Sequence, residues 1–204
     1  MEKTGTFSIL AISEHPKLIG VAVASGSTSV GIRVPHAKPG VGVVATQAYT
    51  NVAYGVEGLK LLAAGYSPAE TLDKLLKEDL ERQMRQVAIL DFAGRKVAFT
   101  GFSVPEWRGE IMGENYIVIG NLLRGRWVLE SMAAKFEGSD GSLAWRMVGA
   151  LEAGAASGGD KRGERSAALI VADHFRVLVN LRVDMHKDPV RELHRQLRSE
   201  CLPV

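Results

Sequence analysis

Hydrophobic residues in the first quarter of the chain occur in short, nearly continuous runs. Residues 6–13 and 19–24 form two such runs, separated only by the polar, proline-containing segment 14–17. Two apolar runs joined this closely predict a β-hairpin. A third run, residues 41–48, follows the turn signal Lys38-Pro39-Gly40 and predicts another buried strand.

After the third strand, the spacing of apolar residues changes to that of a helix. Apolar side chains between residues 56 and 63 recur with helical periodicity. Ser67 predicts the start of a second helix, because Pro68 follows it and Glu70 completes a capping box. The charged segment 77–85 is interpreted as a solvated helical face rather than a binding patch.

Strands and helices are grouped along the rest of the chain instead of strictly alternating. Grouped elements favour an α+β fold over a doubly wound parallel sheet. No repeat, low-complexity tract or linker divides the sequence, so we expect one domain over residues 1–204. The remaining elements are predicted as strands at 87–92, 96–100, 116–119, 167–172 and 177–183, and as helices at 126–136, 143–156 and 189–197.

The composition narrows the class of protein. The 204 residues include 25 basic and 23 acidic side chains, which gives no overall positive field, so we expect no nucleic-acid partner. The single cysteine, Cys201, excludes an intramolecular disulfide framework and a cysteine-cluster metal site. No apolar run reaches the roughly 18 residues of a membrane span, and the start lacks a signal-peptide pattern. We therefore expect a cytoplasmic protein without a membrane partner.

The common catalytic sequence motifs are absent. The chain has no phosphate-binding loop, dinucleotide fingerprint, zinc-binding helix motif or Gly-x-Ser-x-Gly nucleophile elbow. Asp184, His186 and Asp188 offer ligands for a divalent cation. However, Asp188-Pro189 is explained as the start of the last helix, so we expect no metal. The remaining candidates are polar residues at the ends of strands.

Thr6 is the first of these candidates, because it opens the first strand directly after Gly5. A threonine hydroxyl needs an adjacent base to act as a nucleophile. If the chain is cut after Gly5, Thr6 carries a free α-amine with a pKa of about 7.7–8.0, which is a usable base at neutral pH. The alternative interpretation is that Thr6 is only a β-branched residue that favours the strand.

A second group of candidates lies where the third strand runs into a helix. Thr46, Gln47 and Asn51 stand at this junction, where backbone N–H groups and side-chain donors can face a developing oxyanion. The alternative is that the segment only makes a turn and caps the helix. Lys38, which precedes the strand, can assist proton transfer if it is desolvated, although such a lysine is more often a solvated turn residue.

The third group of candidates comes from the second half of the chain. Asp160, Arg162 and Ser166 lie in a glycine-rich loop that enters a strand, where an arginine can bind a substrate carboxylate. The alternative is a surface turn with one local ion pair. Asn121 follows Gly120 at the end of a strand, and its alternative role is that of a turn residue.

Several of these segments form a combined pattern that spans nearly the whole chain. The combination is specific, although each segment alone is a weak signal. The segments are TFSILA (6–11), GVAVAS (20–25), GVGVVATQ (40–47), GN (120–121), GGDKRG (158–163) with SAAL (166–169), and LRVD (181–184). Together they resemble the domain of unknown function 1028 (DUF1028) family of the N-terminal nucleophile (Ntn) hydrolase superfamily.

The resemblance implies a four-layer αββα sandwich, with two antiparallel sheets between helical layers. It also implies that the residue opening the first strand, here Thr6, is the nucleophile and that its freed amine is the base. Thr46 and Gln47 then lie at the oxyanion side, and Lys38 falls, by spacing, where a proteasome-like subunit carries its catalytic lysine. Family members begin Met-Thr, so the additional residues here imply cleavage after Gly5 or another start codon.

The residues and the resemblance together favour an Ntn-type hydrolase that cleaves a small-molecule amide through a threonine acyl-enzyme, without a metal or an organic cofactor. In this hypothesis Asn121, Asp160, Arg162 and Ser166 orient the substrate or the amine. Two alternatives use the same fold without catalysis, namely a small-molecule binding module and a structural protein of several copies. The fold also leads us to expect a homo-oligomer.

Overall fold

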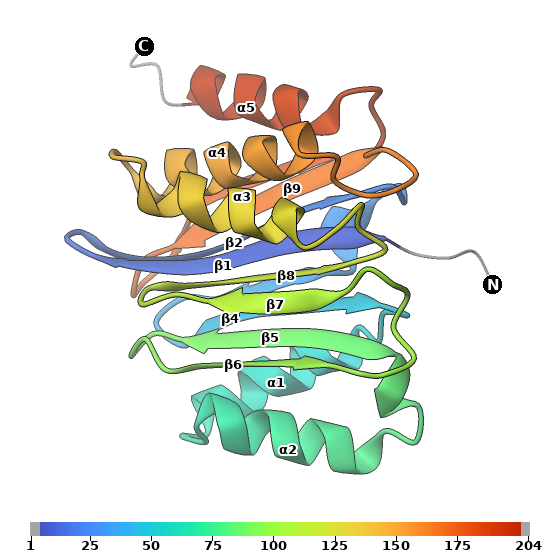
Figure 1. Cartoon of the computed structure of the whole chain (residues 1–204). Helices are drawn as coiled ribbons and strands as arrows, with labels where there is room; N and C mark the ends of the chain where they lie inside the picture. The colour runs from blue at the N-terminus through green and yellow to red at the C-terminus, as the bar shows by residue number, and fades with distance from the viewer. Residues whose placement is uncertain (1–4, 201–204) are drawn as a thin grey trace.

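Two antiparallel β-sheets form the centre of the structure, a computed structural model that describes residues 5–200 (Figure 1). Cys201 and the residues before Gly5 lie outside the described part. The larger sheet contains, in spatial order, β10 (Val177–Val183), β9 (Ser166–Ala172), β2 (Lys17–Ser25), β1 (Thr6–Glu14), β8 (Tyr116–Asn121) and β7 (Gly109–Met112). The smaller sheet contains β3 (Pro35–Lys38), β4 (Gly42–Ala48), β5 (Arg85–Asp91) and β6 (Lys96–Thr100).

Helices cover the outer face of each sheet, as Figure 1 shows. The larger sheet is covered by α3 (Trp127–Glu137), α4 (Leu143–Ala156) and α5 (Pro189–Glu200). The smaller sheet is covered by α1 (Ala53–Ala63) and α2 (Pro68–Glu78). Two short 3₁₀ helices, η1 (Val30–Ile32) and η2 (Arg82–Met84), lie in connections. The described chain is therefore an α+β fold with two antiparallel sheets and five α-helices.

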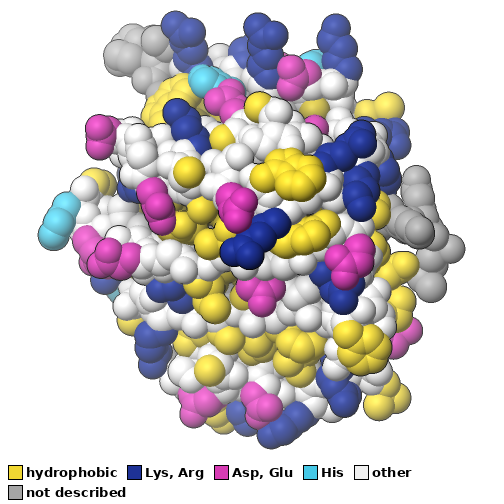
Figure 2. Space-filling model, viewed as in Figure 1, with side chains coloured by type: hydrophobic (Ala, Val, Ile, Leu, Met, Phe, Trp, Pro, Cys, Tyr) yellow, Lys and Arg dark blue, Asp and Glu magenta, His cyan; other side chains and the backbone are white. Residues whose placement is uncertain are grey.

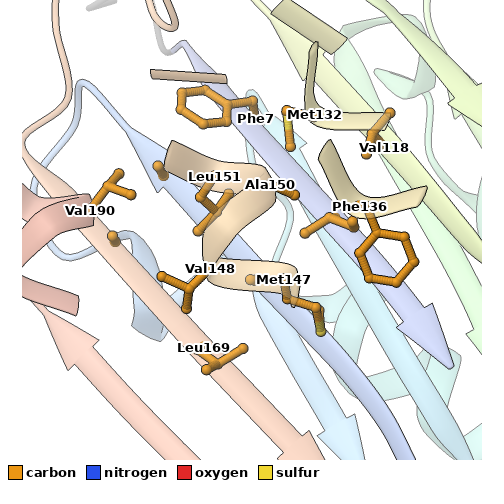
Figure 3. Packing of buried hydrophobic residues seen from close by; sticks show 14 of the residues in the cluster. Phe7, Val118, Met132, Phe136, Met147, Val148, Ala150, Leu151, Leu169 and Val190 are labelled. Carbon is orange, nitrogen blue, oxygen red and sulfur yellow. The ribbon is translucent and has the colours of Figure 1, made fainter. Parts of the chain in front are cut away.

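Three clusters of buried hydrophobic side chains hold these elements together. The largest joins α3, α4 and α5 to one face of the larger sheet, and Figure 3 shows Phe7 of β1 beside Met132 and Leu151 in it. A second cluster fills the space between the sheets, and a third lies between the smaller sheet and its two helices. Alternate residues of β1 serve different clusters, because successive side chains of a strand point to opposite faces. Phe7 faces the helices, whereas Leu10 faces the other sheet.

Local sequence signals predicted several elements correctly. The predicted hairpin is formed by β1 and β2, whose paired ends are Glu14 and Lys17. The predicted capping box is present at the start of α2, where Ser67 and Glu70 hydrogen-bond each other's backbone N–H. Asp188 accepts a hydrogen bond from the Arg191 N–H, which confirms its role at the start of α5.

The structure corrects the prediction for residues 77–85. Helix α2 ends at Glu78, and Arg85 is a buried residue at the start of β5 rather than part of a solvated helical face. Its guanidinium forms an ion pair with Asp79, at 2.8 Å between Nε and Oδ2, in which both side chains are about nine-tenths buried. The strands β3 and β7 were not predicted, because four residues are too few to show a clear alternation.

The surface bears charges of both signs. On the face in Figure 2, Lys and Arg side chains are interspersed with Asp and Glu, and no single sign dominates. Within the described residues, no helix has the length and apolar character needed to cross a membrane.

Candidate functional site

A row of polar side chains crosses the end of the larger sheet at Thr6. In the antiparallel register Thr6 pairs with Ser25 on one side and with Asn121 on the other, and Ser25 pairs in turn with Ser166. Directly opposed residues of neighbouring strands point to the same face of a sheet. All four side chains are buried, and Thr6 is only 3% exposed. Four strands thus bring four polar residues to one edge of the space between the sheets.

A second polar row faces the first from the smaller sheet. It consists of Gln47, Gln86 and Thr100, which are paired across β4, β5 and β6. Gln86 Oε1 accepts hydrogen bonds from the side-chain amides of Gln47, at 2.8 Å, and of Asn121, at 2.9 Å. Gln47 Nε2 also lies 3.3 Å from the Thr6 carbonyl oxygen. The two rows therefore form one hydrogen-bonded network that fixes the surroundings of Thr6.

Three donors converge on the carbonyl oxygen of Gly5, the residue before Thr6. The Thr6 and Ser25 hydroxyls each lie 2.6 Å from this oxygen, and Arg162 Nη2 lies 3.1 Å from it. The two hydroxyl oxygens are 3.0 Å apart, so a proton can pass between them. A carbonyl oxygen held by several donors is polarised in the way that stabilises an oxyanion.

The same contacts place the Thr6 hydroxyl next to the Gly5 carbonyl carbon. A C=O bond is about 1.23 Å long, so Thr6 Oγ1 lies no more than about 3.8 Å from this carbon. Reacting atoms in near-attack arrangements are about 3–3.5 Å apart. The arrangement can therefore support attack of the Thr6 hydroxyl on the peptide bond between Gly5 and Thr6.

Asp160 holds Arg162 in position for this contact. Its carboxylate is completely buried and accepts hydrogen bonds from the Gly26 N–H, the Arg162 N–H and the Arg162 guanidinium. The Arg162 side chain is 26% exposed, so one side of the ion pair reaches the surface. The prediction of a local ion pair in this loop is correct, and the structure adds that the pair contacts the residue before Thr6.

Glu164 closes the loop around Asp160. Its Oε1 atom accepts a hydrogen bond of 2.9 Å from the Asp160 backbone N–H. Burial raises the pKa of the Glu164 carboxyl, and the negative charges of Asp160 and Asp188 also raise it, while backbone N–H donors oppose the shift. Glu164 is thus a half-buried carboxyl that retains its proton to a higher pH than an exposed glutamate does.

Asn121 contributes an acceptor that is not used within residues 5–200. Its Nδ2 atom donates to Gln86, but its Oδ1 atom is buried without a hydrogen-bond partner. A buried polar atom without a partner is costly and uncommon. Because Asn121 pairs with Thr6 in the sheet, this acceptor belongs to the residue directly opposite Thr6 on β8.

Three other predicted site residues, Thr46, Asn51 and Ser166, hydrogen-bond to groups other than Thr6 and Gly5. The Thr46 backbone N–H donates to Val34, and its hydroxyl donates to the Asn51 carbonyl. Asn51 Oδ1 accepts a hydrogen bond from the N–H of Ala53, the first residue of α1. These contacts of Thr46 and Asn51 fit the alternative interpretation of a turn, whereas Gln47 from the same junction belongs to the network around Thr6. The Ser166 hydroxyl donates to the Ser27 carbonyl and accepts from the Val30 N–H.

The structure does not bring Lys38 to Thr6. Lys38 is exposed and pairs with Gly42 at one end of β4, whereas Gln47, which contacts Thr6, lies at the other end. Five residues of strand separate the two ends, which corresponds to about 16 Å. Spacing along the sequence suggested the lysine, but the direction of β3 turns it away from the site.

Ser25, Gln86 and Glu164 belong to this site but were not singled out in the sequence. Ser25 could have been found by counting back along the predicted hairpin from its turn, since the register then pairs it with Thr6. No local signal marked Gln86 or Glu164. Among the described residues, His, Cys, Asp and Glu side chains form no group of three that could hold a metal ion.

Comparisons with known proteins confirm the DUF1028 part of the resemblance seen in the sequence. Residues 6–193 match a family of unknown function, DUF1028, and the match begins at Thr6. The crystal structure of a DUF1028 protein from Silicibacter pomeroyi is similar, with 33% identity and a TM-score of 0.91 over 98% of this chain and 87% of that chain. Anbu (ancestral beta-subunit) from Yersinia bercovieri is a distant match, with 14% identity and a TM-score of 0.45 over 98% of each chain. No curated protein matches the sequence. With nearly its whole length covered, the chain belongs to the DUF1028 family.

Proposed function

We propose that this protein is an N-terminal-nucleophile hydrolase that frees Thr6 by cutting its own chain after Gly5 and then cleaves a small amide. The observation that carries the proposal is the Gly5 carbonyl oxygen, on which the Thr6 and Ser25 hydroxyls and Arg162 converge. The order of layers, helices outside two stacked antiparallel sheets, supports the four-layer αββα sandwich of such hydrolases.

The self-cleavage step needs no cofactor. Thr6 Oγ1 bonds to the Gly5 carbonyl carbon while its proton moves to Ser25 Oγ, and Ser25 gives its own proton to the carbonyl oxygen. The intermediate then collapses: its C=O bond reforms, the C–N bond breaks, and the proton of its hydroxyl moves to the Thr6 nitrogen. The product is an ester between Gly5 and the Thr6 hydroxyl, which water hydrolyses to a Gly5 carboxylate and a free Thr6 amine.

The freed threonine then acts on a substrate in the same surroundings. Its α-amine, with an ordinary pKa of about 7.7–8.0, accepts the hydroxyl proton as Thr6 attacks the substrate carbonyl. Ser25 and Arg162, the donors that hold the Gly5 oxygen, stabilise the oxyanion. The unused Asn121 Oδ1 atom orients the amine, because it is the buried acceptor opposite Thr6. Water finally hydrolyses the acyl-enzyme and regenerates the free threonine.

The intact mass of the purified full-length protein tests the proposal. We expect the wild type to lose residues 1–5 and Thr6→Ala to keep them, because alanine has no hydroxyl to attack Gly5. Thr6→Ser keeps a hydroxyl and is expected to be cut. Thr50→Ala is the matched control, since it removes a threonine hydroxyl whose one hydrogen bond within residues 5–200 is to the Ala48 carbonyl. Ser25→Ala is expected to slow the cleavage.

A processed wild type then justifies a screen of small amides, with Thr6→Ala as the inactive reference. If the wild type instead keeps residues 1–5 at full occupancy under native conditions, Thr6 has no free amine. The hydrolase proposal then fails, and the small-molecule binding module becomes the leading hypothesis.

A further inference from the structure

We infer that the acyl site beside Thr6 disfavours acyl groups whose carbon next to the carbonyl carries a side chain in the L configuration. The preferred substrates are amides of glycyl or straight-chain acyl groups, and amides of L-amino acids with a side chain are cleaved more slowly. This inference rests on the proposed function, because it treats Gly5 as the first acyl group that Thr6 receives.

The evidence begins with the space around Gly5. A Cβ atom added to Gly5 would lie 2.4 Å from Asp160 Oδ2, 2.6 Å from its Cγ and 2.7 Å from its Oδ1. Contacts under 3.0 Å essentially never occur for real Cβ atoms. An L side chain at this carbon therefore requires the carboxylate of Asp160 to move.

The Asp160 carboxylate is not free to move. It is fully buried, and it accepts hydrogen bonds from the Gly26 N–H at 2.8 Å and from the Arg162 N–H at 2.9 Å. The Arg162 guanidinium adds bonds of 3.0 Å from Nε and 2.8 Å from Nη2. Moving a buried charge away from these partners is strongly unfavourable.

The backbone at Gly26 also packs closely against the Asp160 carboxylate. A Cβ atom on Gly26 would lie 2.7 Å from both Asp160 Oδ2 and the Gly163 carbonyl oxygen, and 2.8 Å from Arg162 Nη2. The backbone at Gly26 and Gly163 therefore packs directly around the ion pair. This side of the acyl site is a rigid wall.

The position of Gly5 indicates where a substrate binds, because self-cleavage and substrate turnover both form an ester with the Thr6 hydroxyl. In self-cleavage and in turnover, the acyl carbon becomes bonded to Thr6 Oγ1, and its oxygen faces Ser25 and Arg162. The next carbon of a substrate must then occupy the place of the Gly5 α-carbon. A CH₂ group fits there, and the rest of the acyl chain leaves in the direction of the Gly5 nitrogen.

Two measurements test the inference. The first compares the rate of self-cleavage of Gly5→Ala with that of the wild type in a cell-free translation time course followed by intact mass. Gly58→Ala serves as the glycine control, because its added Cβ would make only ordinary contacts of 3.5 Å or more. We expect Gly5→Ala to be cut about 10- to 100-fold more slowly, the size of effect that one additional methyl group produces in a fitted site.

The second measurement uses the processed wild type and therefore does not depend on the folding of a variant. It compares kcat/KM for the p-nitroanilides of N-acetylglycine and N-acetyl-L-alanine, and we expect the glycine compound to be preferred about 10- to 100-fold. Equal cleavage rates for Gly5→Ala and the wild type, or equal kcat/KM for the two anilides, would overturn the inference while leaving the hydrolase proposal intact. A wild type that is never cut would overturn both.

Discussion

Gln86 is the residue through which the two polar rows of the site are joined, and its replacement gives the sharpest test of the structure. Its side chain is completely buried between the sheets. Its Nε2 atom contacts the Thr100 hydroxyl and the Gly109 and Gly120 carbonyl oxygens, at 3.0, 3.1 and 2.9 Å. Its Oε1 atom accepts from Gln47 and Asn121. Gln86→Leu keeps the approximate size of the side chain and removes all of these hydrogen bonds.

The expected loss follows from the groups left without a partner. Asn121 already has one unused buried oxygen, and the substitution also leaves its Nδ2 donor unpaired. An orphaned buried donor costs about 1–3 kcal/mol. Gln47 keeps its contact with the Thr6 carbonyl, so its loss is smaller. We expect Gln86→Leu to lower the free energy of unfolding by about 2–4 kcal/mol, on the basis of these costs.

Urea denaturation measures this loss through the shift of the midpoint at constant slope. Thr100→Val is the matched control, because it removes only one of the Gln86 partners and is expected to cost about 1 kcal/mol. Intact mass should confirm that both variants are compared in the same processed or unprocessed form. A Gln86→Leu protein within about 0.5 kcal/mol of the wild type, a change typical of unimportant surface positions, would refute the network described here.

Three further predictions concern stability. Arg85→Met leaves a buried carboxylate without its counter-charge and should cost about 3–5 kcal/mol in urea, whereas Arg126→Met breaks an exposed pair and should cost less than about 1 kcal/mol; equal losses would contradict the burial of the first pair. Glu164→Gln should be more stable than the wild type at neutral pH, because burial raises the pKa of the carboxyl and its charged form is then disfavoured. This difference should shrink as the pH falls through the raised pKa and the wild type takes up its proton; a difference independent of pH would refute the assignment. Gly55→Ala should lower the thermal midpoint, because its Cβ would lie 2.1 Å from the ring of a β3 histidine, while Gly58→Ala in the same helix should raise it through helix propensity; two shifts of the same sign would contradict this contact.

Much of the fold followed from patterns that act over a few residues. The β1–β2 hairpin, the capping box of α2 and the start of α5 each depend on neighbours in the sequence, and each was predicted. The errors lie where a distant partner decides the outcome. Arg85 appeared to continue a charged helical face, but its burial depends on the carboxylate of Asp79 and on the pairing of β5. The single domain and the homo-oligomer stay predictions.

The candidate site divides along the same line. Position alone singled out Thr6, and the loop composition singled out Arg162, which contacts the Gly5 carbonyl, and Asp160, which forms an ion pair with Arg162. Thr46, Asn51 and Lys38 fitted the pattern equally well, yet Thr46 and Asn51 form hydrogen bonds in the turn before α1, and Lys38 pairs at the far end of β4. Residue type and local spacing could not separate these two groups.

The sequence by itself determined most of the strands and helices and the threonine that opens the first strand, because these depend on periodicity and capping within one segment. Only the tertiary structure decided that Ser25, Asn121 and Gln86 surround Thr6 and that Lys38 does not. The physical reason is that strand order and register bring together residues that are far apart in the sequence, such as Thr6 and Asn121. A change of one residue in this register would turn each side chain of the strand to the opposite face of the sheet.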